Sequence, residues 1–216
     1  MDSKNEKKYI FRIFLAVFFA GVASLQMELS VLREATFIFG STAFTNSFVI
    51  SIFLAGLAIG SYSGNLLVRM WRGRASELFL ISQGVHIALI LFFVFTKSYV
   101  LYGSYSKFTS LLYFGFVTVI PSIVGGMSFS FFLNMLYELG EKHIALIYAI
   151  STAGNVFSGL LHGLVLVPYI GMLSTYLVAI LNIGLAMLLS VRFHFINGLF
   201  LSLLIVVAGF LSVSIR

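Results

Sequence analysis

Four polar side chains could carry chemistry in a chain that is otherwise strongly apolar: Glu28, Arg33, Asn46 and His162. Each lies within or at the rim of an apolar segment, where an unpaired charge costs on the order of several kcal/mol. An ionised carboxylate in such a segment needs a cation or a hydrogen-bond donor beside it. We therefore predict that these four side chains form a functional polar cluster in the outer half of a membrane-spanning bundle.

The spacing of Glu28 and Arg33 argues against a simple pair on one helix. Five residues rotate the second side chain by about 140° from the first, whereas intrahelical pairs need a spacing of about three or four. Glu28 either has a functional or assembly role or forms a structural salt bridge, and Arg33, Asn46 and His162 are its candidate partners. Arg33 and its neighbour Glu34 are predicted to be solvated at the membrane interface.

Composition predicts the class of protein that holds these side chains. Of the 216 residues, 60% are hydrophobic and 9% are charged, whereas a soluble domain has roughly 25% charged residues. The predicted fold class is therefore an all-α polytopic integral membrane protein, surrounded by the lipid bilayer. Cysteine is absent, which excludes structural disulfides, Cys-ligated zinc and iron–sulfur clusters. The net charge of +6 does not indicate nucleic acid binding, because the basic residues are spread over the ends of apolar segments.

Seven segments are apolar enough to span a bilayer, for which about 20 mainly apolar residues are needed. They are residues 13–32, 44–68, 78–95, 108–137, 144–167, 172–191 and 195–213. We interpret the first as a retained helix rather than a secretory signal, because it has no convincing small-residue cleavage site. No soluble domain or long linker separates the segments, so residues 1–216 are predicted to form a single transmembrane domain with about seven helices in one bundle.

Lysine and arginine in the short connections predict the orientation, because cytoplasmic loops carry an excess of them. With the N-terminus inside, nine of the 13 basic residues fall on the inner side, and the other four on the outer side are Arg33, Lys97, Lys107 and Arg216. We predict a multi-pass protein of the cytoplasmic (inner) membrane with a cytoplasmic N-terminus. Seven spans place the C-terminus outside.

Two sets of glycines recur at the four-residue spacing that places them on one helix face: Gly56, Gly60 and Gly64 in the second span, and Gly159 and Gly163 in the fifth. Small residues at this spacing let another helix backbone approach closely. We predict close helix packing at both faces. In the fourth span, Pro121 followed by glycines at 125 and 126 predicts a kink.

Chemistry beyond the polar cluster has little support in the residue pattern. No nucleophile with its base, phosphate loop or acid pair in a pocket can be recognised, so no catalytic residue, cofactor or metal site is predicted. His86 and His162 could clamp a haem, but their predicted depths differ by about one helical turn or more. Gln26, Asn46, Asn155 and Asn182 are interpreted as hydrogen-bonding contacts between helices, which for Asn46 is the alternative to a role in the polar cluster.

A further pattern joins the early residues to two later stretches. Glu28 and Arg33 are followed by FGSTAFTNSFVISIFLAGLAIGSYSG at residues 39–64, by PSIVGGMSF at 121–129 and by IYAISTAGNVFSGLLHGLVLVPYIG at 147–171. These stretches resemble the membrane region of bacterial spermidine synthase-like proteins. The resemblance implies several spans that precede a soluble aminopropyltransferase-type domain. That domain has no counterpart in these 216 residues, so the resemblance carries over no catalytic residue.

The resemblance implies a non-catalytic multi-pass membrane module. It would either anchor or serve a separate soluble synthase-like enzyme or form the membrane half of a longer protein, and an outside C-terminus conflicts with a cytosolic enzyme attached there. The alternative is a small secondary transporter for a cation or a polyamine, in which Glu28 meets the charge. A third interpretation is a haem-bearing electron carrier.

Overall fold

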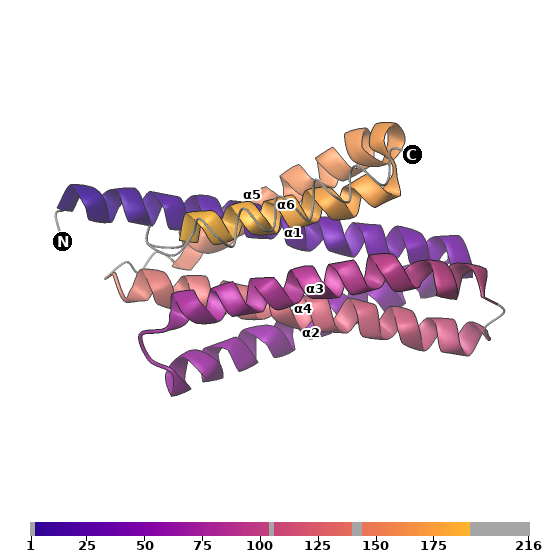
Figure 1. Ribbon diagram of the computed structural model, residues 1–216, viewed down its shortest axis with the longest axis horizontal. Helices are drawn as coiled ribbons and strands as arrows, with labels where there is room; N and C mark the ends of the chain where they lie inside the picture. The colour runs from indigo at the N-terminus through magenta and orange to yellow at the C-terminus, as the bar shows by residue number, and fades with distance from the viewer. Residues whose placement is uncertain (1–2, 104–105, 140–143, 191–216) are drawn as a thin grey trace.

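The computed structural model describes residues 3–103, 106–139 and 144–190, which are helical apart from short connections (Figure 1). The elements are α1 (Ser3–Phe39), α2 (Ala43–Met70), α3 (Ala75–Tyr102), α4 (Lys107–Tyr137), α5 (Ile144–Leu161), η1 (His162–Ile170) and α6 (Met172–Ser190). The element η1 is a π-helix that continues α5 directly.

Six helices in the described residues are long and apolar enough to cross a membrane, with η1 counted as part of the fifth. The prediction of about seven is corrected to six for this part of the chain, and the predicted segment 195–213 lies outside it. A helix is confirmed at each of the other six predicted segments. The first begins ten residues earlier than predicted, at Ser3, because lysine, glutamate and arginine are good helix formers although they are not apolar.

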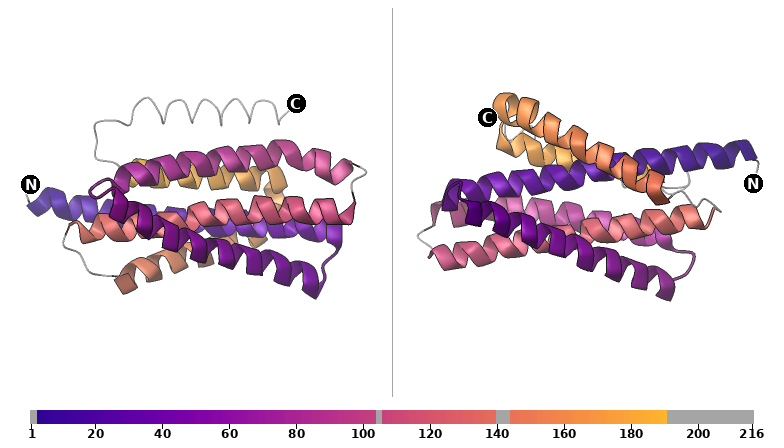
Figure 2. Two further views of the ribbon diagram at one scale, coloured as in Figure 1. Left: turned by 90° about the horizontal axis from the view of Figure 1, so that it is seen from below. Right: turned by 180° about the vertical axis from the view of Figure 1, so that it is seen from behind.

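Successive helices run antiparallel, so the connections alternate between the two ends of the bundle (Figures 1 and 2). We call the end at which α1 begins the N-terminal end. The α2–α3 connection lies at this end, and α6 ends there. The Tyr9 hydroxyl donates a hydrogen bond to the carbonyl of Ser190 at 3.0 Å. Arg12 donates to the carbonyl of Leu188 at 2.9 Å, which satisfies the last turn of α6. Within the described residues, six crossings therefore return the chain at Ser190 to the end at which α1 begins.

At the opposite end of the bundle, α2 and α4 each begin at a side-chain N-cap. The Thr42 side chain accepts a hydrogen bond from the backbone N–H of Thr45 at 3.1 Å, and Ser106 accepts from Thr109 at 3.2 Å. Such N-caps satisfy one of the free N–H groups in the first turn of a helix. Gly40 has a φ of +82°, which glycine adopts at no steric cost, and it allows the short turn between α1 and α2.

Aromatic side chains fill the core between the helices. The Phe93 ring lies edge to face with the rings of Phe114 and Tyr176, at centroid distances of 6.1 and 5.5 Å. Phe79 and Phe132 form a second contact at 4.5 Å. Large apolar side chains also cover the outward faces, for example Leu54 of α2 and Leu160 of α5. Helices that are apolar on both faces are typical of a membrane bundle.

The glycines of α2 lie against the backbone of α4, which α2 crosses (Figure 2). A Cβ atom placed on Gly60 would lie 2.0 Å from the carbonyl oxygen of Ile123, and one on Gly64 would lie 2.8 Å from Met127 Cα. A Cβ on Gly56 would lie 2.5 Å from Ser122 Cβ. The two backbones are therefore in van der Waals contact from Gly56 to Gly64, a little over two helical turns.

Close helix packing in the fifth span was predicted at Gly159 and Gly163, and these residues are wrong. The close approach to α1 is at Gly154, where a Cβ would lie 2.3 Å from the Phe18 carbonyl oxygen. Gly159 has only a side-chain atom at 3.7 Å, and Gly163 has no neighbour within 4 Å in the described part of the chain. The buried positions are Ser158 and His162, so each glycine one residue later is rotated about 100° away from the interface. η1 also leans away from α1 toward its end (Figures 1 and 2).

The antiparallel arrangement makes a labelling prediction. Arg72 lies in the exposed α2–α3 connection, and Lys107 is exposed at the start of α4, at the other end of the bundle. In this cysteine-free chain, Arg72→Cys and Lys107→Cys should be labelled from opposite sides of sealed vesicles by a membrane-impermeant maleimide. Labelling of both from the same side would contradict a bundle in which α3 crosses the membrane.

Candidate functional site

The carboxylate of Glu28 lies on the side of α1 that faces α2 and α4. It lines a cavity of about 10 Å³ together with residues of α2, α3 and α4, whose polar members are Ser24, Glu28, His86, Thr118 and Ser122. His86 is buried, and Glu28 is half-buried. Among the described residues, no salt bridge or hydrogen bond reaches the Glu28 carboxylate. Within the described part of the chain, this side chain therefore presents an acidic group without a partner to a small cavity.

On the α4 wall of this cavity, several oxygen atoms have lone pairs that can accept a hydrogen bond or bind a cation. Pro121 lies inside α4 and has no N–H, so the carbonyl of Val117 lacks the donor that would close its helical hydrogen bond. The Ser122 hydroxyl donates to the Thr118 carbonyl at 2.5 Å, and the Thr118 hydroxyl donates to the Phe114 carbonyl at 2.6 Å. Both hydroxyl protons are thus bound to backbone, and the oxygen lone pairs remain available as acceptors.

The structure does not bring the four predicted cluster residues together. Arg33 is exposed on the side of α1 near η1, close enough to His162 for an electrostatic interaction. Asn46 is half-buried in the first turn of α2. Glu28 lies about 140° around α1 from Arg33, as the five-residue spacing requires. The cluster prediction is therefore corrected to three separate places: Glu28 at the cavity, Arg33 with His162, and Asn46 in the first turn of α2.

This separation also bears on the two histidines. His86 lines the cavity beside Glu28, whereas His162 is buried near Arg33, where α5 becomes the π-helix η1. The Nδ1 atom of His162 has no hydrogen-bond partner among the described residues. The two rings approach α1 from different sides, which does not suit two axial ligands of one haem.

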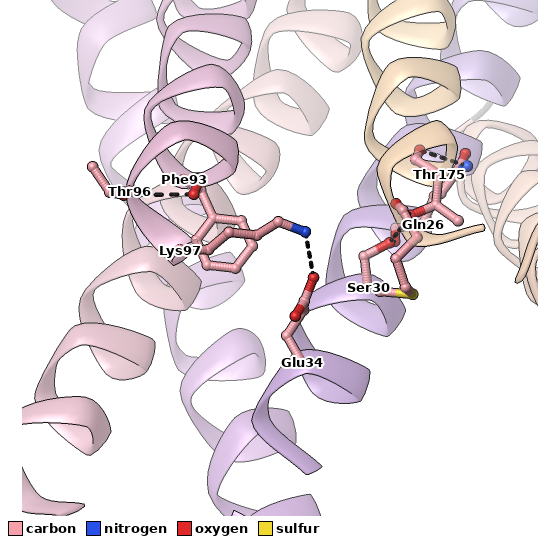
Figure 3. A network of polar contacts seen from close by, with 8 residues as sticks. Gln26, Ser30, Glu34, Phe93, Thr96, Lys97 and Thr175 are labelled. Atoms are coloured by element: carbon pink, nitrogen blue, oxygen red, sulfur yellow. Dashed lines mark hydrogen bonds and ion pairs between the residues drawn. The ribbon is translucent and has the colours of Figure 1, made fainter. Parts of the chain in front are cut away.

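A second polar site, which the sequence reasoning missed, lies between α1, α3 and α6 (Figure 3). Gln26 donates to the backbone carbonyl of Thr175 at 2.9 Å, and the hydroxyls of Ser30 and Thr175 are 2.9 Å apart. One turn beyond Ser30 on α1, Glu34 forms an ion pair with Lys97 of α3 at 2.6 Å. The Lys97 ammonium also lies 4.9 Å from the centre of the Tyr176 ring, within the range of a cation–π contact.

The expectation that Glu34 is solvated is therefore wrong. Its side chain is 9% exposed and that of Lys97 is 14% exposed. One signal in the sequence could have found this site: Gln26, Ser30 and Glu34 follow one another at steps of four residues, which places them on one face of α1. The pair is complete within the bundle, so its geometry suits a structural lock between α1 and α3 rather than a free binding group.

Comparison with known proteins gives one distant similarity. No protein-family model matches the chain, and no solved structure is significantly similar to it. The chain is 26% identical over 166 residues to "Polyamine aminopropyltransferase 2" of Aquifex aeolicus (strain VF5). The match covers 76% of this chain and 33% of that protein, so the chain spans about a third of the length of its relative. This agrees with a resemblance to part of a spermidine synthase-like protein, while the membrane assignment comes from the long apolar helices.

Proposed function

We propose that this chain is a non-catalytic membrane module that anchors or serves a polyamine aminopropyltransferase-like enzyme. The observation that carries the proposal is the similarity to an aminopropyltransferase over only a third of that protein, in a chain whose described residues form six long apolar helices. A bundle of this kind supplies a membrane attachment, and the soluble chemistry would belong to another domain or another polypeptide.

The N-terminal end of the bundle is where such an enzyme would be held. The start of α1 and the end of α6 lie together there, joined by the hydrogen bonds from Tyr9 and Arg12. Three exposed arginines lie at the same end: Arg69 in the last turn of α2, and Arg72 and Arg74 in the α2–α3 connection. Under the predicted orientation this end is cytoplasmic, because it carries most of the basic residues. Within the described residues, six crossings return the chain to this end at Ser190, where a separate cytosolic enzyme would be held.

A second candidate function is a small secondary transporter, and one observation favours it. The Glu28 carboxylate faces a cavity with no cationic partner among the described residues. Ionisable groups inside a membrane often mark an ion or substrate path. The cavity is far smaller than a polyamine, so within this second candidate a small cation fits better than a polyamine.

The proposed function is tested on material isolated from native membranes through an affinity tag on this protein. We expect the isolated material to catalyse aminopropyl transfer to a polyamine acceptor and to contain a synthase-type nucleotide-binding domain, on the same chain or on a partner. A mock isolation from untagged cells is the control. Isolated material without that domain and without transfer activity would contradict the proposal. Uptake of labelled spermidine or Na⁺ by vesicles that hold the purified chain alone would favour the transporter.

A further inference from the structure

The cavity beside Glu28 has the chemistry of a site for a positively charged ligand. One wall, on α1, carries the carboxylate. The opposite wall, on α4, carries the Ser122 and Thr118 hydroxyls, whose protons are engaged by backbone carbonyls. Val117 lines the same cavity, and its carbonyl is freed by Pro121. Every one of these groups can offer an oxygen lone pair, so the cavity is complementary to a cation and not to an anion.

The size of the cavity decides which cation can enter. Its volume is about 10 Å³, which corresponds to roughly one water-sized probe. A polyamine or another organic cation has several such volumes and cannot be enclosed. A single dehydrated or partly hydrated monovalent ion fits, and hard cations prefer ligands of this kind, namely carboxylate, hydroxyl and carbonyl oxygens.

The position of the cavity supports the same conclusion. In membrane carriers, carbonyl groups released where a transmembrane helix is interrupted coordinate Na⁺ near the middle of the bilayer. Pro121 lies near the middle of the 31-residue helix α4, and Glu28 faces it from α1. His86 of α3 is the other titratable side chain that lines the cavity.

We propose that Glu28, Thr118, Ser122 and the carbonyl of Val117 bind a small monovalent cation of the size of Na⁺ between α1 and α4. The inference goes beyond the proposed membrane module and does not depend on it, since the site is complete within the described residues. A bound cation would neutralise the carboxylate and connect α1 to α4 beside the contact between α2 and α4. A chain that does not bind Na⁺ would contradict this inference but would not change the expected result of the aminopropyl-transfer experiment. The two proposals are therefore tested independently.

The test compares the melting temperature of the purified wild-type chain in NaCl and in choline chloride at equal ionic strength. Na⁺ should raise the Tm of wild type by a few degrees in a saturable manner, because a ligand that binds only the folded state stabilises it. Glu28→Gln should lose the Na⁺-dependent rise. Glu77→Gln is the matched control, because Glu77 is exposed at the start of α3 and pairs only weakly with Arg74, at 4.0 Å; its Na⁺ response should equal that of wild type.

Two α4 variants keep the test decisive if Glu28→Gln does not fold. Ser122→Ala removes one oxygen and retains the Cβ atom, and it should raise the half-saturating Na⁺ concentration about tenfold, a change of ~1.4 kcal/mol. Pro121→Ala restores an N–H that can bond the Val117 carbonyl, and it should weaken the Na⁺ response without lowering the Tm in choline. Equal wild-type Tm values in the two salts, or an unchanged response in Glu28→Gln or in Ser122→Ala, would overturn the proposal.

Discussion

Gly60→Leu is expected to lower the free energy of unfolding by about 3 kcal/mol or more, the upper range for overpacking. Even a Cβ atom at this position would lie 2.0 Å from the Ile123 carbonyl oxygen and 2.9 Å from Ile123 Cα. These are backbone atoms of α4, which cannot rotate aside as a side chain can, so the two helices must separate. Thermal and denaturant unfolding of the purified protein in detergent measures the change.

Gly84→Leu is the matched control for this substitution. Gly84 also lies in the middle of a long helix, α3, but a Cβ atom there meets nothing within 4 Å in the described structure. We expect Gly84→Leu to be neutral or slightly stabilising, because leucine has the higher helix propensity. Equal stabilities of the Gly60 and Gly84 variants would show that α2 does not pack on α4 as described.

Lys97→Met should destabilise the bundle by about 3 kcal/mol, since removing one partner of a buried ion pair leaves the other charge uncompensated. We take the lower end of the usual range, because the two side chains retain 14% and 9% exposure. Methionine keeps the apolar stem that packs near Tyr176 and removes the ammonium group. The decrease in stability therefore measures the cost of leaving the Glu34 carboxylate without its cation.

The double variant Glu34→Gln/Lys97→Met separates the charge from the packing. It should recover a substantial part of the stability lost in Lys97→Met, because the remaining amide carries no buried charge. Arg74→Ala is the control, since its pair with Glu77 is exposed and pairs of that kind contribute little. A double variant as unstable as the sum of the two single variants would mean that Glu34 and Lys97 do not interact.

Much of the fold could be predicted from the sequence because it depends on local properties. Whether a segment spans a membrane depends on its own length and apolarity, and a helix was found at each predicted segment within the described residues. The four-residue spacing of Gly56, Gly60 and Gly64 places them on one face of any α-helix, so a close contact at that face could be proposed before its partner was known. The bounds were less predictable, because α1 continues through charged residues that favour helix.

The partners of the polar side chains were decided by the tertiary structure alone. Glu34 and Lys97 are 63 residues apart, and no local spacing relates them. Glu28 and Arg33 are near neighbours in sequence, yet one faces the cavity at α4 and the other faces His162. The α-helical geometry fixes the angle between two side chains on α1. Which neighbouring helix each of those side chains faces depends on how the six described helices pack together.

The same reason explains the error at the fifth span. Sequence alone determined that small residues recur along α5, and it could not select the face that meets α1. A shift of one residue turns a side chain by about 100°, so the contact falls at Gly154 while Gly163 remains open. For this protein the sequence determined the membrane class, the helices and the rotation of residues within each helix. The packing of the helices against one another decided which carboxylate is paired, which faces a cavity, and which glycine touches a neighbouring backbone.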